Sequence, residues 1–124
     1  TKDNYDEQSI DELSPDELAQ YYDYRIQYSQ EDEAYVGSVV EWPSLKAHGE
    51  SQGEALDEIK KAVELSIEDC RETGDDYPEP FNLREFSGRF SVRIQPSLHR
   101  ELAKEAQDEG VSLNQLVTRK LAAN

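Results

Sequence analysis

The stretch GRFSVRIQPSLHRELAKEAQDEGVSLNQL, residues 88–116, changes its pattern twice. Its first part alternates polar and apolar residues, in the order Arg89, Phe90, Ser91, Val92, Arg93 and Ile94. Alternation with a period of two predicts a β-strand with one polar and one apolar face. Because a lone strand cannot bury its apolar face, the pattern also predicts a second strand beside it.

Two helical patterns follow the strand, and a glycine separates them. Pro96 ends the strand, and we expect Ser97 to cap the first helix. The apolar residues of that helix lie on one side and are Leu98, Leu102 and Ala106. Gly110 then favours a helix end, because glycine readily adopts the left-handed backbone conformation that closes many helices.

The second helix begins with a capping-box pattern, in which Ser112 precedes Gln115 by three residues. Its inward-facing residues are apolar and are Leu113, Leu116, Val117 and Leu121. A strand and two short helices form a unit too small to fold alone, since chains below about 40 residues usually need oligomerisation or another support. We therefore predict a dimer whose core consists of Phe90, Val92, Ile94, Leu102 and Leu116.

Charge is divided unevenly along the 124 residues. Residues 1–86 carry 24 Asp/Glu against 7 Lys/Arg, a net charge of −17, whereas residues 87–124 carry 4 against 6, a net charge of +2. An acidic front repels nucleic acid and favours either a basic protein partner or a solvated surface without a partner. The basic end is the segment whose charge suits nucleic acid.

The sequence pattern of residues 14–51 predicts a short helix and three strands. SPDEL (14–18) is typical of a helix start, with a serine cap, proline at the first position and a glutamate that completes a capping box. The period-two run YYDYRIQYS (21–29) predicts a half-buried strand. AYVGSVVEW (34–42) is apolar on both faces and predicts a central strand, and SLKAHGES (44–51) supplies a short third one.

The longest helix is predicted after Ser51, where Glu54 completes another capping box. Apolar residues repeat along it at intervals of three and four: Leu56, Ile59, Val63, Ile67 and Cys70. Gly74 favours its end, and DDYPEPFN (75–82) breaks regular structure with two prolines. A sheet covered by one helix is an α+β fold, whose uncovered face or edge we expect to meet a second molecule.

These patterns divide the chain into an acidic tail with a short helix (1–20), a small α+β domain with a three-stranded antiparallel sheet (21–80), a linker (81–86) and a strand-helix-helix domain (87–124). No stretch approaches the roughly 20 apolar residues that a membrane span requires. The single cysteine, Cys70, has no partner for an internal disulfide, which suits a reducing compartment. We therefore expect a soluble, cytoplasmic protein.

The order of strand, helix, glycine and helix over residues 87–123 resembles the ribbon-helix-helix domain of Arc- and MetJ-type repressors. In that family two chains pair their strands and lay the ribbon in the major groove of DNA. The resemblance implies that base edges are contacted by Arg89, Ser91 and Arg93. It also implies that a phosphate is held by the backbone of Ser112, Leu113 and Asn114. Arginine can read guanine with two hydrogen bonds, and a helix N-terminus presents free N–H groups to an anion.

The front part is similar to the N-terminal domain of HicB-family antitoxins, whose sheet is described as a partial RNase H fold. The resembling segments are YRIQYSQEDEAYVGSVVEWPSL, SQGEALDEIKKAVEL and YPEP, within residues 21–80. A ribbon-helix-helix tail after such a domain strengthens the resemblance. It implies an antitoxin of a HicA/HicB-like type II system, which blocks a small basic HicA-like ribonuclease with its front domain and represses its own operon by binding operator DNA. We expect a homodimer through the tail, with a tetramer through the front domains as the larger assembly.

The alternative is a stand-alone ribbon-helix-helix repressor whose front domain oligomerises or binds a ligand. A divergent nuclease is a third hypothesis, because Asp23 and Glu41 lie near strands, but a two-metal site needs several converging carboxylates. His48 and His99 are isolated in the sequence from Cys70, so we expect surface histidines and no metal, no cofactor and no enzyme activity.

Overall fold

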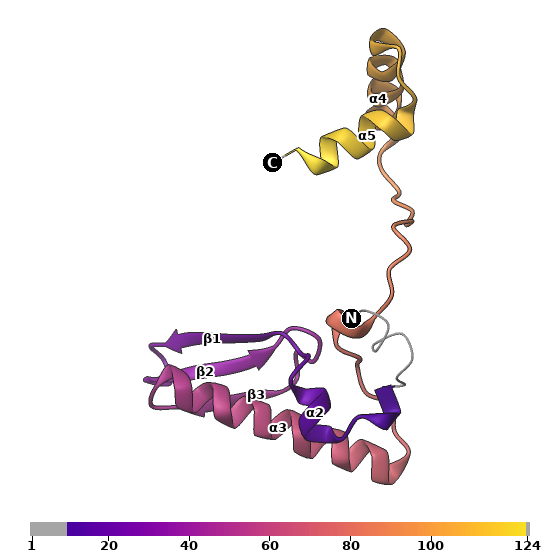
Figure 1. Cartoon of the computed structure of the whole chain (residues 1–124). Helices are drawn as coiled ribbons and strands as arrows, with labels where there is room; N and C mark the ends of the chain where they lie inside the picture. The colour runs from indigo at the N-terminus through magenta and orange to yellow at the C-terminus, as the bar shows by residue number, and fades with distance from the viewer. Residues whose placement is uncertain (1–9, 124) are drawn as a thin grey trace. The chain divides into compact units, whose positions relative to one another are not determined.

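The computed structural model describes residues 10–123, which divide into two compact units between Glu85 and Phe86 (Figure 1). Of the acidic tail predicted over residues 1–20, the part before residue 10 lies outside this range. The first unit consists of η1 (Ile10–Glu12), α2 (Pro15–Ala19), β1 (Tyr24–Ser29), β2 (Ala34–Val39), β3 (Lys46–Gly49), α3 (Gln52–Thr73) and η2 (Phe81–Leu83). The second contains α4 (Pro96–Glu109) and α5 (Leu113–Ala122). No helix within residues 10–123 is long and apolar enough to cross a bilayer.

The three strands form one antiparallel sheet in the order β1-β2-β3, which confirms the α+β class and the central position of the second strand. β1 begins at Tyr24, three residues later than predicted, because Tyr22 turns into the core. The hydroxyl of Tyr22 donates a hydrogen bond to the carbonyl of Pro78 at 2.6 Å. Tyr22 therefore joins the start of the sheet to the segment that leaves α3.

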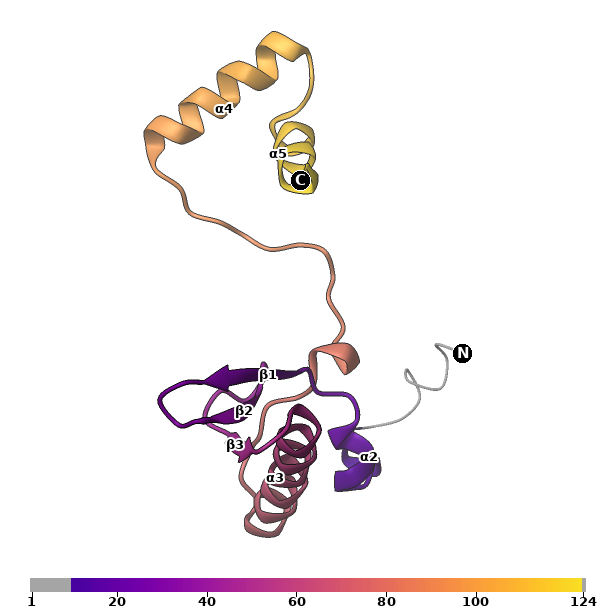
Figure 2. The ribbon, with the colours of Figure 1, turned by 90° about the vertical axis from the view of Figure 1, so that its left-hand side faces the viewer.

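Helix α3 covers one face of the sheet (Figure 2). Its predicted cap is confirmed in part, since the hydroxyl of Ser51 accepts a hydrogen bond from the N–H of Glu54 at 3.1 Å. The carboxylate of Glu54 accepts instead from the N–H of Glu50, one residue before the cap, at 2.6 Å. Gly74 ends the helix in the left-handed conformation, with φ of 79°, as predicted.

Close contact between α3 and the sheet depends on Gly49 and Gly37. A Cβ atom on Gly49 would lie 2.8 Å from the Cα of Ala55, and a Cβ atom on Gly37 would lie 2.9 Å from the carbonyl oxygen of Ala55. Both distances are shorter than van der Waals contact, so the first turn of α3 rests directly on the strand backbones. The side-chain period alone does not reveal this requirement.

We expect Gly49→Ala to destabilise the first unit by about 1–3 kcal/mol, because the added methyl group forces two backbones apart. Trp42 is the only tryptophan and packs against the core of this unit, so its fluorescence during urea unfolding measures the change. Gly53→Ala is the control, since a Cβ atom there meets nothing within 4 Å. Equal stability of the two variants would contradict the close-contact argument.

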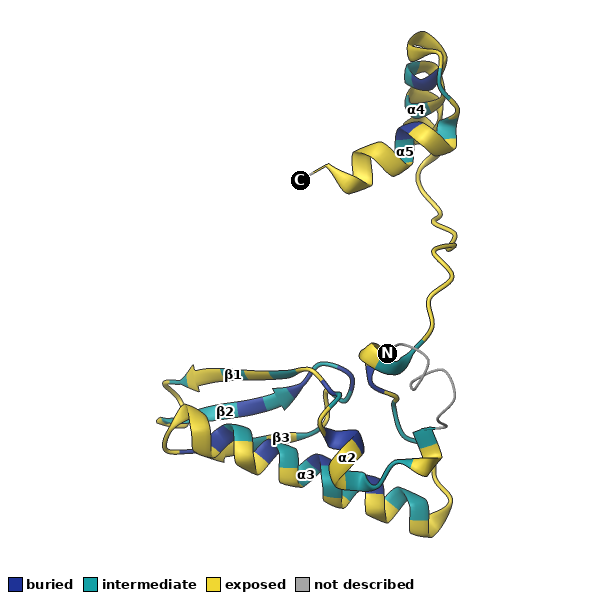
Figure 3. Ribbon diagram, in the orientation of Figure 1, coloured by how far each residue is buried: buried dark blue, intermediate teal, exposed yellow. Residues whose placement is uncertain are grey.

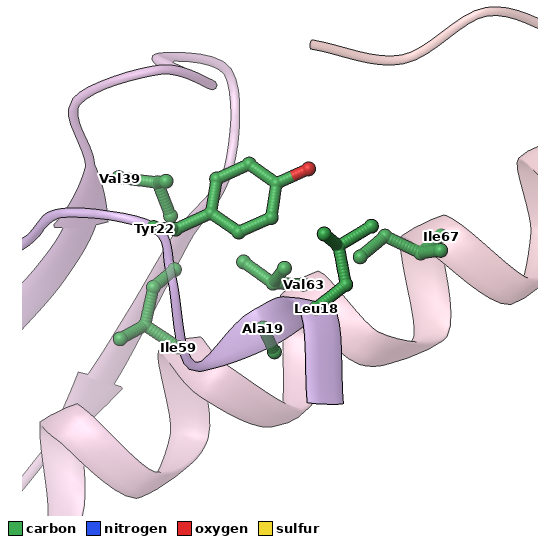
Figure 4. Packing of buried hydrophobic residues seen from close by; sticks show 7 residues of the cluster. All are labelled: Leu18, Ala19, Tyr22, Val39, Ile59, Val63 and Ile67. Atoms are coloured by element: carbon green, nitrogen blue, oxygen red, sulfur yellow. The ribbon is translucent and has the colours of Figure 1, made fainter. Parts of the chain in front are cut away.

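The core of the first unit lies between α2, α3 and the sheet (Figure 4). Its buried residues are Leu18, Ala19, Tyr22, Val39, Ile59, Val63 and Ile67. The predicted cap of α2 is confirmed, because Ser14 and Glu17 form a reciprocal capping box. α2 therefore contributes to the core as well as α3, whereas the sequence patterns assigned the cover of the sheet to one helix.

The segment after α3 packs against the first unit up to Arg84. The ring of Tyr77 stacks on Trp42 with centroids 6.1 Å apart, and Pro80 is buried. The N–H of Phe81 donates to the carboxylate of Glu41 at 2.9 Å. Residues 81–86 were predicted to be a linker, but residues 81–83 form η2, and the side chain of Arg84 donates to the carbonyl of Glu79.

Candidate nucleic-acid interface

The segment predicted to form the DNA-binding strand, residues 89–94, is neither helix nor strand in the single chain. A strand is stabilised by hydrogen bonds to a neighbouring strand, and the rest of the described chain supplies none here. The paired ribbon therefore stays a prediction, because it requires a second copy of the chain.

Every side chain of this segment is exposed (Figure 3). The apolar residues Phe90, Val92 and Ile94 have exposed fractions of 73%, 67% and 39%. The guanidinium groups of Arg89 and Arg93 form no ion pair or hydrogen bond with any part of residues 10–123. The segment thus combines three exposed apolar side chains with two guanidinium groups that have no partner within residues 10–123.

A shallow hollow beside this segment is lined by Ser91, Val92, Arg93, Ile94 and His99. His99 lies in the first turn of α4 and is exposed. It was predicted only to be a surface histidine, since an isolated histidine carries no periodic signal. The structure places it next to two of the three residues predicted to contact bases.

Helix α4 starts two residues earlier than predicted. Its N-cap is Gln95 and Pro96 is its first residue, so the assignment of Ser97 as the cap was wrong. Proline fits the first helical position because its fixed φ is already helical and it has no N–H to satisfy. No side chain caps α4.

The two helices of the second unit form a pair that is held at their turn and between their side chains. Gly110 has φ of 72°, as predicted, and the N–H of Val111 donates to the carbonyl of Ala106 at 3.0 Å. Leu116 is fully buried and Ala106 is nearly so. Leu116, predicted in the dimer core, is thus already enclosed within one chain, whereas Leu102 is half-buried.

Two ion pairs join α4 to α5: Arg119 with Glu109, and Lys120 with Glu105 at 3.2 Å. The hydrogen bond from Arg119 lowers the pKa of the Glu109 carboxyl. Because all four side chains are partly exposed, water and salt screen the pairs, and each contributes little stability. Leu116 is the only buried residue of α5.

The N-terminus of α5 has the predicted capping box. Ser112 accepts from the N–H of Gln115, and the Gln115 side chain accepts from the N–H of Ser112, both at 3.0 Å. The N–H of Ser112 is therefore occupied. The N–H groups of Leu113 and Asn114 have no acceptor within the described chain and lie in the first helical turn, where an anion is favoured.

The two carboxylates weighed for a nuclease site hold backbone and side-chain groups of the first unit. Glu41 is buried, with an exposed fraction of 7%, and accepts hydrogen bonds from the N–H groups of Asp23 and Phe81. The carboxylate of Asp23 accepts from Asn82 at 3.3 Å. Glu41 therefore fastens the segment after α3 to the sheet, and the sequence offered no signal for this role beyond its place at the end of a strand.

Comparison with known proteins supplies one match. Neither a search of curated proteins nor a search of solved structures finds a significant match to the chain. The one match is to a family model. The matched residues begin in the second half of α3 and include the exposed segment 89–94, α4 and nearly all of α5. The predicted resemblance is thus confirmed over residues 66–121, which match the model of the HicB family.

Proposed function

We propose that this chain is the antitoxin of a HicA/HicB-like type II toxin-antitoxin system. Its front unit neutralises a small basic ribonuclease, and its tail represses the operon by binding DNA. The observation that carries the proposal is the exposed, alternating segment 89–94 ahead of a fixed α4-α5 pair, inside the region that matches the HicB family. HicB-type antitoxins are generally not enzymes, and the proposal assigns no reaction to the chain.

Dimerisation through the tail is supported by what the second unit leaves exposed. Only Ala106 and Leu116 are buried among its described residues. The exposed large apolar side chains are Phe86, Phe90, Val92, Ile94, Leu98 and Leu121. Two segments 89–94, paired antiparallel, cover three of these in each chain, and full burial of one such side chain stabilises by about 1.5–3 kcal/mol.

Operator DNA is the partner that suits this ribbon. Its opposite face carries Arg89, Ser91 and Arg93, and a two-stranded ribbon fits the major groove, where arginine distinguishes guanine. A phosphate is then held at the start of α5, by the N–H groups of Leu113 and Asn114. Ser112 joins them only if Gln115 releases its N–H.

Neutralisation of a toxin is assigned to the first unit because of its charge. Its 24 carboxylates make a basic protein the favoured partner. Two copies of the first unit can also associate through the outer edges of β1 and β3, which pair with no other described strand. This would join two tail-linked dimers into a tetramer.

We expect the association rate with the small basic protein encoded by the neighbouring gene to fall at least about tenfold between roughly 50 and 500 mM salt. Charges that lie outside the contact steer the encounter, so the dissociation rate should change much less. Stopped-flow fluorescence of Trp42 measures both rates. Absence of such a neighbouring protein, or of any binding by it, would contradict the antitoxin function and favour a stand-alone repressor.

A further inference from the structure

We propose that the basic partner docks on the outward face of α3, with Leu65 at the centre of the contact. This inference rests on the proposed function and names the surface that the toxin uses.

The outward face of α3 is an acidic stripe that Lys61 and Leu65 interrupt. The helix turns Ala55, Ile59, Val63 and Ile67 toward the sheet, and all four are buried. The exposed side chains opposite them are Glu54, Asp57, Glu58, Lys61, Leu65, Glu68, Asp69 and Glu72. Residues spaced by three and four lie side by side on a helix, so three carboxylates precede Lys61 and Leu65 on this face and three follow them.

Leu65 is the unusual residue of this stripe, because 54% of it is exposed. The other exposed large apolar residues described in the first unit have ring contacts: Tyr28 packs edge-on against Tyr35, and Phe81 lies under the guanidinium of Arg84. Leu65 lies among charged neighbours of its own helix face. In many protein interfaces an apolar side chain makes the central contact and charged residues form the rim around it.

The opposite face of the unit is less acidic. The three strands contain no Asp or Glu. Gly37 faces α3, and side chains alternate along a strand, so the side chain of Ser38 faces the other way. Its register partners, Arg25 and Lys46, belong to the same open face. Arg25 and Lys46 form no ion pair within residues 10–123. The uncovered face or an edge of the sheet was predicted to meet a second molecule, but the open face offers a basic partner fewer carboxylates than the α3 face does.

Charge also excludes the other occupants of the α3 face. A second copy of the stripe would bring carboxylates against carboxylates, and nucleic acid would bring phosphates against them. A basic protein complements six carboxylates and excludes water from Leu65 in the same contact. We therefore assign the α3 face to a basic protein partner.

The test measures binding of the purified neighbouring-gene product to the full-length chain and two matched double variants. Glu68→Lys/Glu72→Lys reverses two charges on the α3 face, and Arg25→Glu/Lys46→Glu reverses two on the open face; all four side chains are exposed. We expect the α3 variant to bind at least about thirtyfold more weakly at low salt, and the open-face variant to bind as tightly as the wild type or more tightly. Leu65→Ala should weaken binding by about tenfold through faster dissociation.

Unfolding followed by Trp42 fluorescence establishes that each variant is folded. Wild-type affinity in the α3 variants, or a loss of affinity in the open-face variant, would overturn the docking surface while leaving the antitoxin function intact. If the wild type itself does not bind, the antitoxin function and this inference both fail.

Discussion

Specific operator binding should collapse when Arg89 and Arg93 are both replaced by alanine. A bidentate pair between arginine and guanine contributes about 1–3 kcal/mol of discrimination, so losing two of them weakens specific binding at least about thirtyfold. Both side chains are exposed and uncommitted in the chain, and the double variant should therefore keep its fold and its dimer. A mobility-shift titration against the DNA upstream of the gene, at about 150 mM salt, measures the loss.

The matched control is Arg100→Ala/Lys104→Ala, which removes the same charge from exposed positions of α4. It should weaken binding to specific and unrelated DNA alike, and only slightly. If the folded Arg89→Ala/Arg93→Ala variant bound the operator as tightly as the wild type, neither arginine would read bases.

Glu41→Ala should cost the first unit about 3–6 kcal/mol of unfolding free energy. The Glu41 carboxylate is buried and accepts from two backbone N–H groups, those of Asp23 and Phe81. A hydrogen bond to a charged group contributes about 1.5–3 kcal/mol, and its loss leaves the buried donor unsatisfied. Since a domain is stable by only about 5–15 kcal/mol, this one change approaches global unfolding.

Urea unfolding followed by Trp42 fluorescence measures this effect, because Trp42 stacks on Tyr77 in the same segment. Glu31→Ala, at an exposed carboxylate in the turn between β1 and β2, is the control and should stay within about 0.5 kcal/mol of the wild type. Glu41→Gln should lie between them, since its amide keeps one acceptor oxygen. A Glu41→Ala protein as stable as the control would show that Glu41 does not fasten the segment.

The parts of the fold that were predictable from the sequence depend on neighbouring residues. Helix starts at Ser14 and Ser112 follow from side chains that reach backbone groups three residues away. Gly74 and Gly110 end helices because they take a positive φ at little cost. The period-two pattern of the first strand and the repeat at three and four of the long helix are local signals of the same kind.

The features that were not predicted depend on distant residues, on a choice between adjacent capping residues, or on the geometry of a helix start. The bond between Glu41 and Phe81 joins positions 40 residues apart, and no local pattern announces it. The assignment of Ser97 as a cap failed because Pro96 itself is favoured at the first helical position. The capping box at Ser112 was predicted, but its consequence, that the Ser112 N–H is no longer free for phosphate, required the geometry.

The ribbon belongs to a different class of prediction, since it needs a second chain. The alternation of residues 89–94 indicates the strand, and the exposure of Phe90, Val92 and Ile94 is what an unpaired chain must show. Within one chain these residues have no strand to pair with, so the evidence for the ribbon must come from the assembly.

The most direct measurement is a mobility-shift experiment in which the full-length chain and a longer, tagged copy are mixed, refolded together and added to the DNA upstream of the gene. The account predicts salt-sensitive shifted bands for each species and at least one hybrid band of intermediate mobility, because two chains build each ribbon. Shifted bands without any hybrid, or no shift at about 150 mM salt, would contradict a DNA-binding ribbon shared between two chains.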